Sequence, residues 1–326
     1  MNLKRYGQNP ILKPIKNNKW ESKGVFNCGV LYIKNKVYIV YRAVGKDGIS
    51  RIGLAVSNDG YHIDKRLSKP IFKPETKYEL PKQKIFKENK KFRGGCADPR
   101  LTQINNKIFL SYAADSDVSH GALASISTKD FIAYNWKAWK RHGILFPDID
   151  DRGATIFPEK IKKNRKSFYA IYHRTPPNIF VAYSDKIKCP WPTDKDELIL
   201  TPRPKMWDDA REGKIGTGTP PIKTKYGWLN IYHAHRVDKT SGKRVYTLGI
   251  FFSDLNNPEK ILYRSPKPIL IPKKNYEKYG LVKNVVFTCG AIIIKNKLFV
   301  YYGGADSVIN VATIPIKEVL SLIKKS

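Results

Sequence analysis

One carboxylic acid and four basic side chains in this chain have the types that acid catalysis and anion binding require. Asp98 stands in the segment Gly94-Gly-Cys-Ala-Asp-Pro-Arg100, where the proline after it favours extended backbone. The basic residues are Arg152, Arg174, Lys214 and His233. Each of them alone is more often a surface or salt-bridged residue, but together they would bind an oxyanion such as phosphate. We therefore predict an acid, Asp98, facing an anion pocket.

Other chemistry finds little support in the sequence. His233 and His235 share a face of a predicted strand, but no third ligand has a suitable spacing, so we predict no metal site. The four cysteines form no C-x-x-C pair, and we expect Cys28 and Cys289 to be small buried residues. No P-loop, dinucleotide fingerprint or Gly-x-Ser-x-Gly elbow occurs, so no organic cofactor is expected.

The net charge of +32 raises the question of a nucleic-acid partner. The lysines are scattered through turns, however, and no zinc-finger, RRM or helix-turn-helix pattern is present. We therefore interpret the charge as a solvated surface that also attracts small anions, and we expect no nucleic-acid partner. The sequence begins without an apolar signal core and has no run that approaches a membrane span, which favours a cytoplasmic protein without a membrane partner.

A degenerate unit that recurs five times must position the candidate residues. Each copy has a turn and then an aromatic-rich strand that ends in tyrosine, at intervals of roughly 60 to 70 residues. The five tyrosines are assigned as Tyr41, Tyr112, Tyr172, Tyr232 and Tyr301. Because the unit is all β, we predict a five-bladed β-propeller in which residues 1–326 form one domain. The repeats span about residues 25–315, and the one persuasive helix begins at Ile316.

Short segments upstream of these strands should carry the site. In a propeller the first strand of each blade lines the central channel, so these segments should converge on one cavity. Polar residues stand beside them, namely Asn27, Asp98, Arg152, Lys214 and Thr288.

The order of the motifs resembles glycoside hydrolase family 130, the β-mannoside phosphorylases and related β-mannosidases. The resemblance extends from about Trp20 to Ala312. It rests on Trp20-Glu-Ser, Phe26-Asn-Cys-Gly, Tyr41-Arg-Ala, Ser50-Arg-Ile-Gly-Leu-Ala, Cys96-Ala-Asp-Pro-Arg, Phe157-Pro-Glu-Lys-Ile, Tyr172-His-Arg, Gly227-Trp-Leu-Asn-Ile-Tyr-His, Val285-Val-Phe-Thr-Cys-Gly and Tyr301-Tyr-Gly-Gly-Ala-Asp306.

The resemblance implies an inverting phosphorylase of the hexosyltransferase type, in which inorganic phosphate attacks the anomeric carbon and yields α-mannose 1-phosphate. Asp98 matches the family's catalytic acid, which delivers its proton through the mannose 3-hydroxyl. Two further groups of residues match the family's site: Arg152, Arg174, Lys214 and His233 as phosphate ligands, and Asn27, Arg42, Arg51 and Asp306 as residues that hold the mannosyl unit. The chain departs from the family pattern at Ala97, where Glu is usual, and at Gly153, where many phosphorylases have Asn.

Elementary chemistry favours the same activity. An inverting hydrolase needs a second carboxylate to activate water, whereas phosphate is already an anionic nucleophile and needs only a cationic cradle. Two alternatives stay open: an inverting β-mannosidase with Glu159 or Asp151 as its base, and a non-catalytic glycan-binding propeller. The linkage (β-1,2 or β-1,4), the acceptor sugar and the formation of a homo-oligomer are also left open.

Overall fold

The computed structural model describes residues 1, 3–80, 92, 94–163, 165–209, 213–237, 242 and 244–323. Strands dominate this part of the chain, which confirms the predicted all-β class. The helical elements described are short: α1 (Thr128–Ile132), the 3-10 turn η2 (Trp136–Ala138), α2 (Asn275–Lys278) and α3 (Ile316–Leu320).

The largest sheet among the described residues has eight strands and consists of two antiparallel meanders. They are joined by a short parallel pairing between β4 and β6, in which Ser50 lies beside Gly95. Its strands are β2 (Gly24–Ile33), β3 (Lys36–Val44), β4 (Ile49–Ser57), β5 (Lys65–Arg66), β6 (Gly94–Ile104), β7 (Lys107–Asp115), β8 (Ser119–Ser127) and β9 (Lys140–Ile144).

Three further antiparallel sheets complete the described fold. One contains β10 (Thr155–Ile156), β11 (Ile161–Lys163), β12 (Lys166–Thr175), β13 (Asn178–Ser184) and β14 (Glu197–Leu200). The next contains β15 (Lys214–Thr217), β16 (Ile222–Thr224), β17 (Gly227–Val237), β18 (Arg244–Ser253) and β19 (Ile261–Arg264). The last contains β1 (Lys4–Arg5), β20 (Val286–Ile294), β21 (Lys297–Gly304) and β22 (Val308–Pro315).

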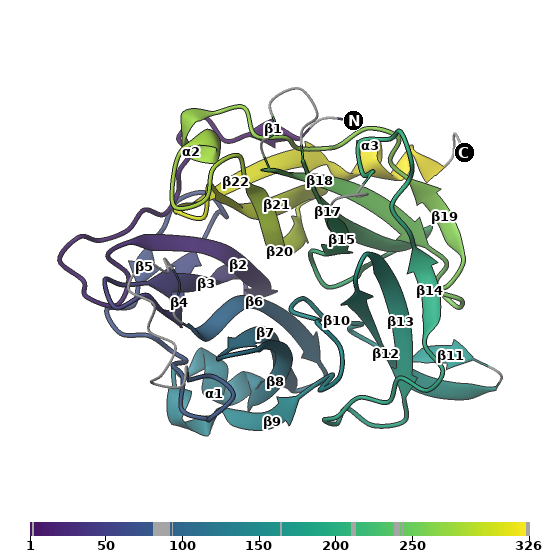
Figure 1. The fold of residues 1–326 in the computed structure, drawn as a ribbon, viewed down its shortest axis with the longest axis horizontal. Coiled ribbons are helices and arrows are strands. Elements are labelled where there is room, and N and C mark those ends of the chain that lie inside the picture. Colours follow the sequence, from purple (N-terminus) through teal and green to yellow (C-terminus); the bar gives the residue numbers. More distant parts are fainter. Residues whose placement is uncertain are drawn as a thin grey trace.

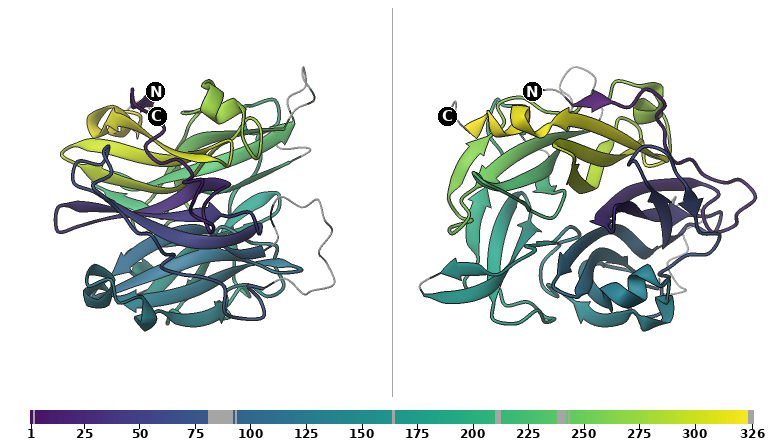
Figure 2. Two further views of the ribbon diagram at one scale, coloured as in Figure 1. Left: turned by 90° about the vertical axis from the view of Figure 1, so that its left-hand side faces the viewer. Right: turned by 180° about the vertical axis from the view of Figure 1, so that it is seen from behind.

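The sheets are arranged around a common centre, as Figure 1 shows and as the right-hand view of Figure 2 shows from behind. Strand β2 packs against both β20 and β6, and β6 in turn contacts β10. The N-terminal strand β1 pairs with β22, so the first residues of the chain complete the sheet formed by the last ones. The apolar core fills the interfaces between neighbouring sheets; one cluster, for example, joins Val25 and Ile39 of the first meander to Val311 of the last sheet.

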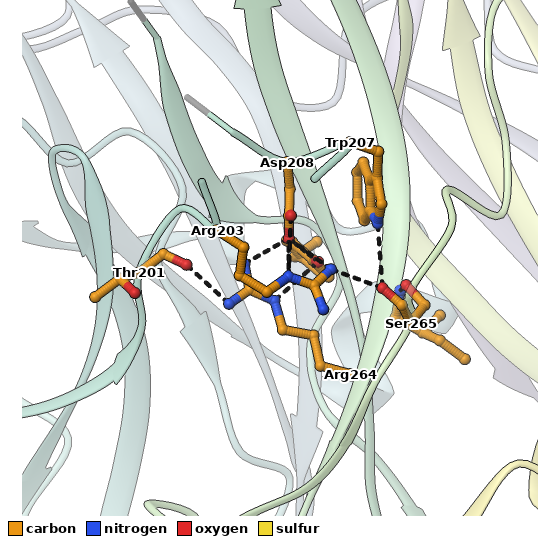
Figure 3. A network of polar contacts seen from close by, with 8 residues as sticks. Thr201, Arg203, Trp207, Asp208, Arg264 and Ser265 are labelled. Carbon is orange, nitrogen blue, oxygen red and sulfur yellow. Dashed lines mark hydrogen bonds and ion pairs between the residues drawn. The ribbon is translucent and has the colours of Figure 1, made fainter. Parts of the chain in front are cut away.

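A recurring polar contact, here called the clamp, ties the tyrosine strands to the outer parts of the sheets. In each clamp a buried carboxylate accepts hydrogen bonds from a strand tyrosine and from an arginine distant in sequence. The clamps are Tyr41–Glu21–Arg66, Tyr112–Glu79–Arg141, Tyr232–Asp208–Arg264 and Tyr302–Glu277–Arg5. Figure 3 shows the third, where Arg203 also donates to Asp208 at 3.0 Å. Tyr172 differs, because its hydroxyl donates to Ser253.

The clamps correct the assignment of the fifth tyrosine. Tyr302, and not Tyr301, binds the carboxylate Glu277, while Tyr301 donates to the carbonyl of Gly60. The register agrees, because Gly290 pairs with Tyr301 just as Gly29 pairs with Val40, one residue before Tyr41. The sequence hid this because two tyrosines are adjacent, and neighbouring strand residues face opposite sides of a sheet.

The helix predicted at Ile316 is confirmed as α3. Helix α1 was not predicted from the sequence. Ser127 caps the helix: its side chain accepts the backbone N–H of Asp130 at 2.9 Å. Serine followed three residues later by an acid is a signature of a helix start, and here it marks only one turn of helix.

The clamp at Glu277 is expected to matter for stability. Glu277 is fully buried and accepts Arg5 Nε at 2.7 Å, the hydroxyl of Tyr302 at 2.8 Å and the backbone N–H of Lys273 at 2.6 Å. Glu277→Ala leaves these donors unpaired, and we expect it to lower the free energy of unfolding by about 3–5 kcal/mol. Chemical denaturation measures this, with the exposed Glu318→Ala as a control expected to stay within about 0.5 kcal/mol of the parent chain. Equal effects of the two substitutions would contradict the importance of the clamp.

Candidate active site

Two strand irregularities aim polar side chains toward the centre. Asn27 lies at a register shift between β2 and β3, and Asp98 at one between β6 and β7. Both have positive φ, 48° for Asn27 and 49° for Asp98, a conformation that non-glycine residues seldom adopt. A β-bulge re-aims a side chain, and strained backbone of this kind is concentrated at functional sites. The extended backbone predicted for Asp98 from its following proline is therefore wrong.

Asp98 is held by two neighbours from the first meander. Its Oδ1 accepts Asn27 Nδ2 at 2.9 Å and Arg42 Nη1 at 3.1 Å. Arg42 is itself fixed, because its Nε donates to Ser50 Oγ at 3.0 Å and its guanidinium lies over the ring of Phe26. The side chain of Asp98 remains 18% exposed, so its carboxyl group is accessible as well as anchored.

A cavity of about 140 Å³ lies beside Asp98 and brings together the predicted acid and all four predicted cations. Asp98, Arg152, Arg174, Lys214 and His233 line it. They come from β6, from the loop before β10 and from β12, β15 and β17, segments far apart in the sequence. The juxtaposition that the sequence predicted is therefore present in the structure.

Arg174 is the most firmly placed of the cations. Its side chain is 8% exposed, and its Nη2 donates to the carbonyl of Asp150 at 2.7 Å. The backbone N–H of Arg174 donates to Oδ1 of the fully buried Asp151, which also accepts the N–H of Gly153. The Nε of Arg174 is buried and has no hydrogen-bond partner in the described part of the chain. A buried guanidinium N–H without a partner is costly, and a bound oxyanion would satisfy it.

Lys214 of β15 pairs with His235 of β17, and Gly216 pairs with His233, so Lys214 and His233 are diagonal neighbours on one face of this strand pair. Burial lowers the pKa of Lys214 below its ordinary value, and the positive charge of Arg174 adds to this. Burial also lowers the pKa of His233 well below its ordinary value, and the positive charges of Arg174, Arg100 and Lys214 lower it further. The imidazole is therefore neutral near pH 7. Gly216 makes room for the ring, since a Cβ there would lie 2.7 Å from it. The cluster thus repels a further positive charge and favours an anion.

Arg100 is a residue that sequence reasoning passed over, although it ends the quoted Cys96-Ala-Asp-Pro-Arg motif. It is 2% exposed and lines the cavity. Its guanidinium donates to the carbonyls of Asp98 at 3.0 Å, Gly218 at 2.8 Å and Thr217 at 3.3 Å. Arg100 therefore joins the acid strand β6 to the strand that begins with Lys214. Gly153, noted above as a departure from the family pattern, also lines the cavity, and the other lining residues that sequence reasoning missed are Gly216, Thr217, Tyr246 and Phe287.

The residues assigned to the mannosyl unit separate into two groups. Asn27 and Arg42 bind Asp98, and Asp306 lies within electrostatic reach of both Arg42 and Asp98. Burial raises the pKa of Asp306 to about 7, with Asp98 adding to the effect and Arg42 opposing it. Arg51 does not join them: it donates to Asp47 at 2.7 Å and to the carbonyl of Ile49. Arg51 pairs with Ala43, next to Arg42, and so occupies the opposite face of the sheet.

Neither residue considered as a hydrolytic base, Glu159 or Asp151, is among the described residues that line the cavity. Glu159 is 47% exposed and contacts Lys223. Asp151 is fully buried and orients backbone N–H groups, as described above. Cys28 and Cys289 are fully buried, as predicted. Within the described ranges, no group of three His, Cys, Asp or Glu residues could hold a metal ion, and no helix has the length and apolarity to cross a membrane.

Comparison with known proteins agrees with the site. The family model described as beta-1,4-mannooligosaccharide phosphorylase, glycoside hydrolase family 130, matches residues 2–325. The 1,2-beta-oligomannan phosphorylase of Thermoanaerobacter sp. (strain X514) is 37% identical over 97% of this chain and 98% of its own length. The beta-1,2-mannobiose phosphorylase of the same organism is 36% identical, with the same coverage. A solved structure of beta-1,2-mannobiose phosphorylase from Listeria innocua, in complex with beta-1,2-mannobiose, superposes with a TM-score of 0.79 at 25% identity and 100% coverage of both chains. This chain therefore belongs to glycoside hydrolase family 130.

Proposed function

We propose that this protein cleaves β-mannosides with inorganic phosphate, giving α-mannose 1-phosphate and a shortened sugar. The observation that carries the proposal is the single cavity in which one carboxyl group, Asp98, faces Arg152, Arg174, Lys214 and His233. The mannoside phosphorylase activity of the relatives at 36% and 37% identity supports the same reaction.

The geometry suits phosphate better than water as the nucleophile. Asp98 is the one carboxylic acid among the described residues that line the cavity. An inverting hydrolase would need a second one to deprotonate water, whereas phosphate brings its own negative charge. The cationic side of the cavity fixes that anion opposite the acid, as in-line attack on the anomeric carbon requires. No metal or organic cofactor takes part in the proposed reaction.

The proposed reaction breaks one bond, forms another, and transfers one proton to the leaving oxygen and one proton back to Asp98. Asp98 gives its proton to the glycosidic oxygen, by way of a sugar hydroxyl in the route that the family resemblance implies. The bond between that oxygen and the anomeric carbon breaks, and its electron pair leaves with the shortened sugar. A phosphate oxygen bonds to the anomeric carbon, and the proton carried by phosphate restores Asp98. Asn27, Arg42 and Asp306 are proposed to hold the mannosyl unit beside the acid.

We propose β-1,2-linked mannosides as the substrates. Both relatives above 30% identity are named for β-1,2-linked mannan or mannobiose. The Listeria innocua enzyme with the same fold was solved with beta-1,2-mannobiose.

We further infer that the fold is a five-bladed propeller. The eight-stranded sheet divides into two meanders, β2–β5 and β6–β9, whose pairing is confined to Ile49 and Ser50 on one strand and Gly94 and Gly95 on the other. Counting these meanders separately yields five units around the centre. The ring would be completed by the pairing of β1 with β22.

A product assay tests the proposed function. The purified protein is incubated with β-1,2-mannobiose or β-1,4-mannobiose, each with and without phosphate. We expect mannose 1-phosphate from the β-1,2 substrate only when phosphate is present. Free mannose formed equally well without phosphate would identify a hydrolase. Binding without turnover of either sugar would favour a glycan-binding protein.

A further inference from the structure

Asp115 is a carboxylate beside the acid to which neither the sequence nor the comparisons assign a role. It ends β7, opposite Gly95 of β6 and Ser119 of β8, and its Oδ1 accepts a hydrogen bond from Ser119 Oγ. Gly95 has φ of 106°, and a Cβ on it would lie 2.1 Å from the carbonyl oxygen of Ser50. The backbones of β4 and β6 can therefore approach closely, which brings Ser50 and Asp115 to either side of one glycine.

The side chain of Arg42 links Ser50 to Asp98. Its Nε donates to Ser50 Oγ at 3.0 Å, and its Nη1 donates to Asp98 at 3.1 Å. Burial lowers the pKa of Arg42, but the nearby carboxylates of Asp98, Asp115 and Asp306 raise it above its ordinary value. One buried guanidinium thus binds Asp98 of β6 and lies within electrostatic reach of two further acids, Asp115 of β7 and Asp306 in the turn after β21.

The charge balance matters for the acid. Arg42 places a positive charge 3.1 Å from Asp98, whereas a general acid has to hold a proton until the leaving group takes it. The negative charge of Asp115 would partly offset the positive charge of the Arg42 guanidinium. The charged groups within electrostatic reach of Asp115 are Arg42, Asp98 and Arg152.

We propose, on the basis of the proposed function, that Asp115 is a positioning residue that offsets the charge of Arg42 and thereby keeps Asp98 supplied with its proton. Asp115 itself neither gains nor loses a proton in the chemical step. Its carboxylate would act through Arg42, by sharing the guanidinium that also binds Asp98.

The pH profile of Asp115→Asn tests this role. The substitution removes one negative charge and keeps an oxygen for Ser119. The site should then hold its proton less tightly, so the alkaline fall of kcat/KM should begin at lower pH. We expect a loss of about tenfold at about pH 8 and less than about threefold at about pH 5. Asp115→Glu should restore much of the activity at the higher pH, and Asp117→Asn, an exposed position in the same turn, should match the parent profile.

Two outcomes would overturn the proposal: an equal loss of activity at every pH, which marks a structural role, or a shift of the alkaline limb to higher pH.

Thermal unfolding shows whether Asp115→Asn folds. Burial raises the pKa of Asp115 to about 6; the positive charge of Arg42 opposes this rise, and the negative charge of Asp98 adds to it. The folded state therefore binds more protons than the unfolded chain between about pH 4 and 6, and stability falls as the pH rises through this window. Asparagine does not titrate, so the variant does not lose stability in this pH window. Its Tm at about pH 8 should therefore be at least that of the parent chain.

The test is separable from the test of the proposed function. Parent activity is first assigned by its products, as mannose 1-phosphate or as free mannose. A hydrolase would contradict the proposed function, yet it would still need a protonated acid at the leaving group. The pH profile of Asp115→Asn would then still decide whether Asp115 supports that acid.

Discussion

Asp98→Asn is expected to reduce mannoside phosphorolysis by roughly 10²- to 10⁴-fold, the contribution of a positioned general acid. An amide has no acidic proton to give to the leaving oxygen. The fold should persist, because the asparagine oxygen can still accept the donors that hold Asp98, Asn27 Nδ2 and Arg42 Nη1. Initial rates with β-1,2-mannobiose and phosphate, together with a thermal melt, measure both effects.

An activated substrate distinguishes loss of the acid from loss of binding. An aryl mannoside with a good leaving group needs no proton on the departing oxygen, so Asp98→Asn should retain most of the parent rate with it. Asp117→Asn serves as the matched carboxylate-to-amide control and should keep near-parent activity with both substrates. Near-normal cleavage of mannobiose by Asp98→Asn would show that another group is the acid.

Arg174→Ala is expected to weaken phosphate use about 10- to 150-fold in kcat/KM for phosphate, which corresponds to losing a buried hydrogen bond to a charged group. The reason is that Arg174 lines the cavity and that its buried Nε has no partner within the described residues. Direct calorimetry of phosphate binding to Asp98→Asn and to Asp98→Asn/Arg174→Ala measures the affinity without turnover. The affinity of the double variant should fall by a similar factor.

Two further variants define what Arg174 supplies. Arg174→Lys keeps the charge but lacks the Nε donor and the planar fork, so we expect phosphate affinity between those of arginine and alanine. Lys166→Ala, at the exposed start of the same strand, removes a surface charge and should leave phosphate affinity within about twofold of the parent. If Lys166→Ala weakened phosphate binding as much as Arg174→Ala, general surface charge would explain the effect, and the cavity would not be the phosphate site.

Much of the architecture was predictable from local patterns. The tyrosine strands can be recognised because alternating apolar residues recur in every unit and Asn-Lys turns precede three of them, and they match β3, β7, β12, β17 and β21. Asp98 and the four basic residues were selected as candidates because their residue types suit one reaction and because each stands near the start or end of a repeated strand. What the repeats could not specify was the exact register, since a shift of one residue exchanges the two faces of a strand. For this reason Tyr301 was assigned as the fifth tyrosine in place of Tyr302.

The sequence by itself determined the all-β class and the recurring unit and singled out Asp98 and four basic residues as candidates, because these depend on residue type and short-range periodicity. Only the tertiary structure decided how they meet. The bulges at Asn27 and Asp98, the links that Arg100 makes to distant carbonyls, and the contact of Arg42 with Asp98 all arise where separate strand units pack together. Their partners lie tens to hundreds of residues apart, and no local pattern encodes the distance between two side chains brought together by packing.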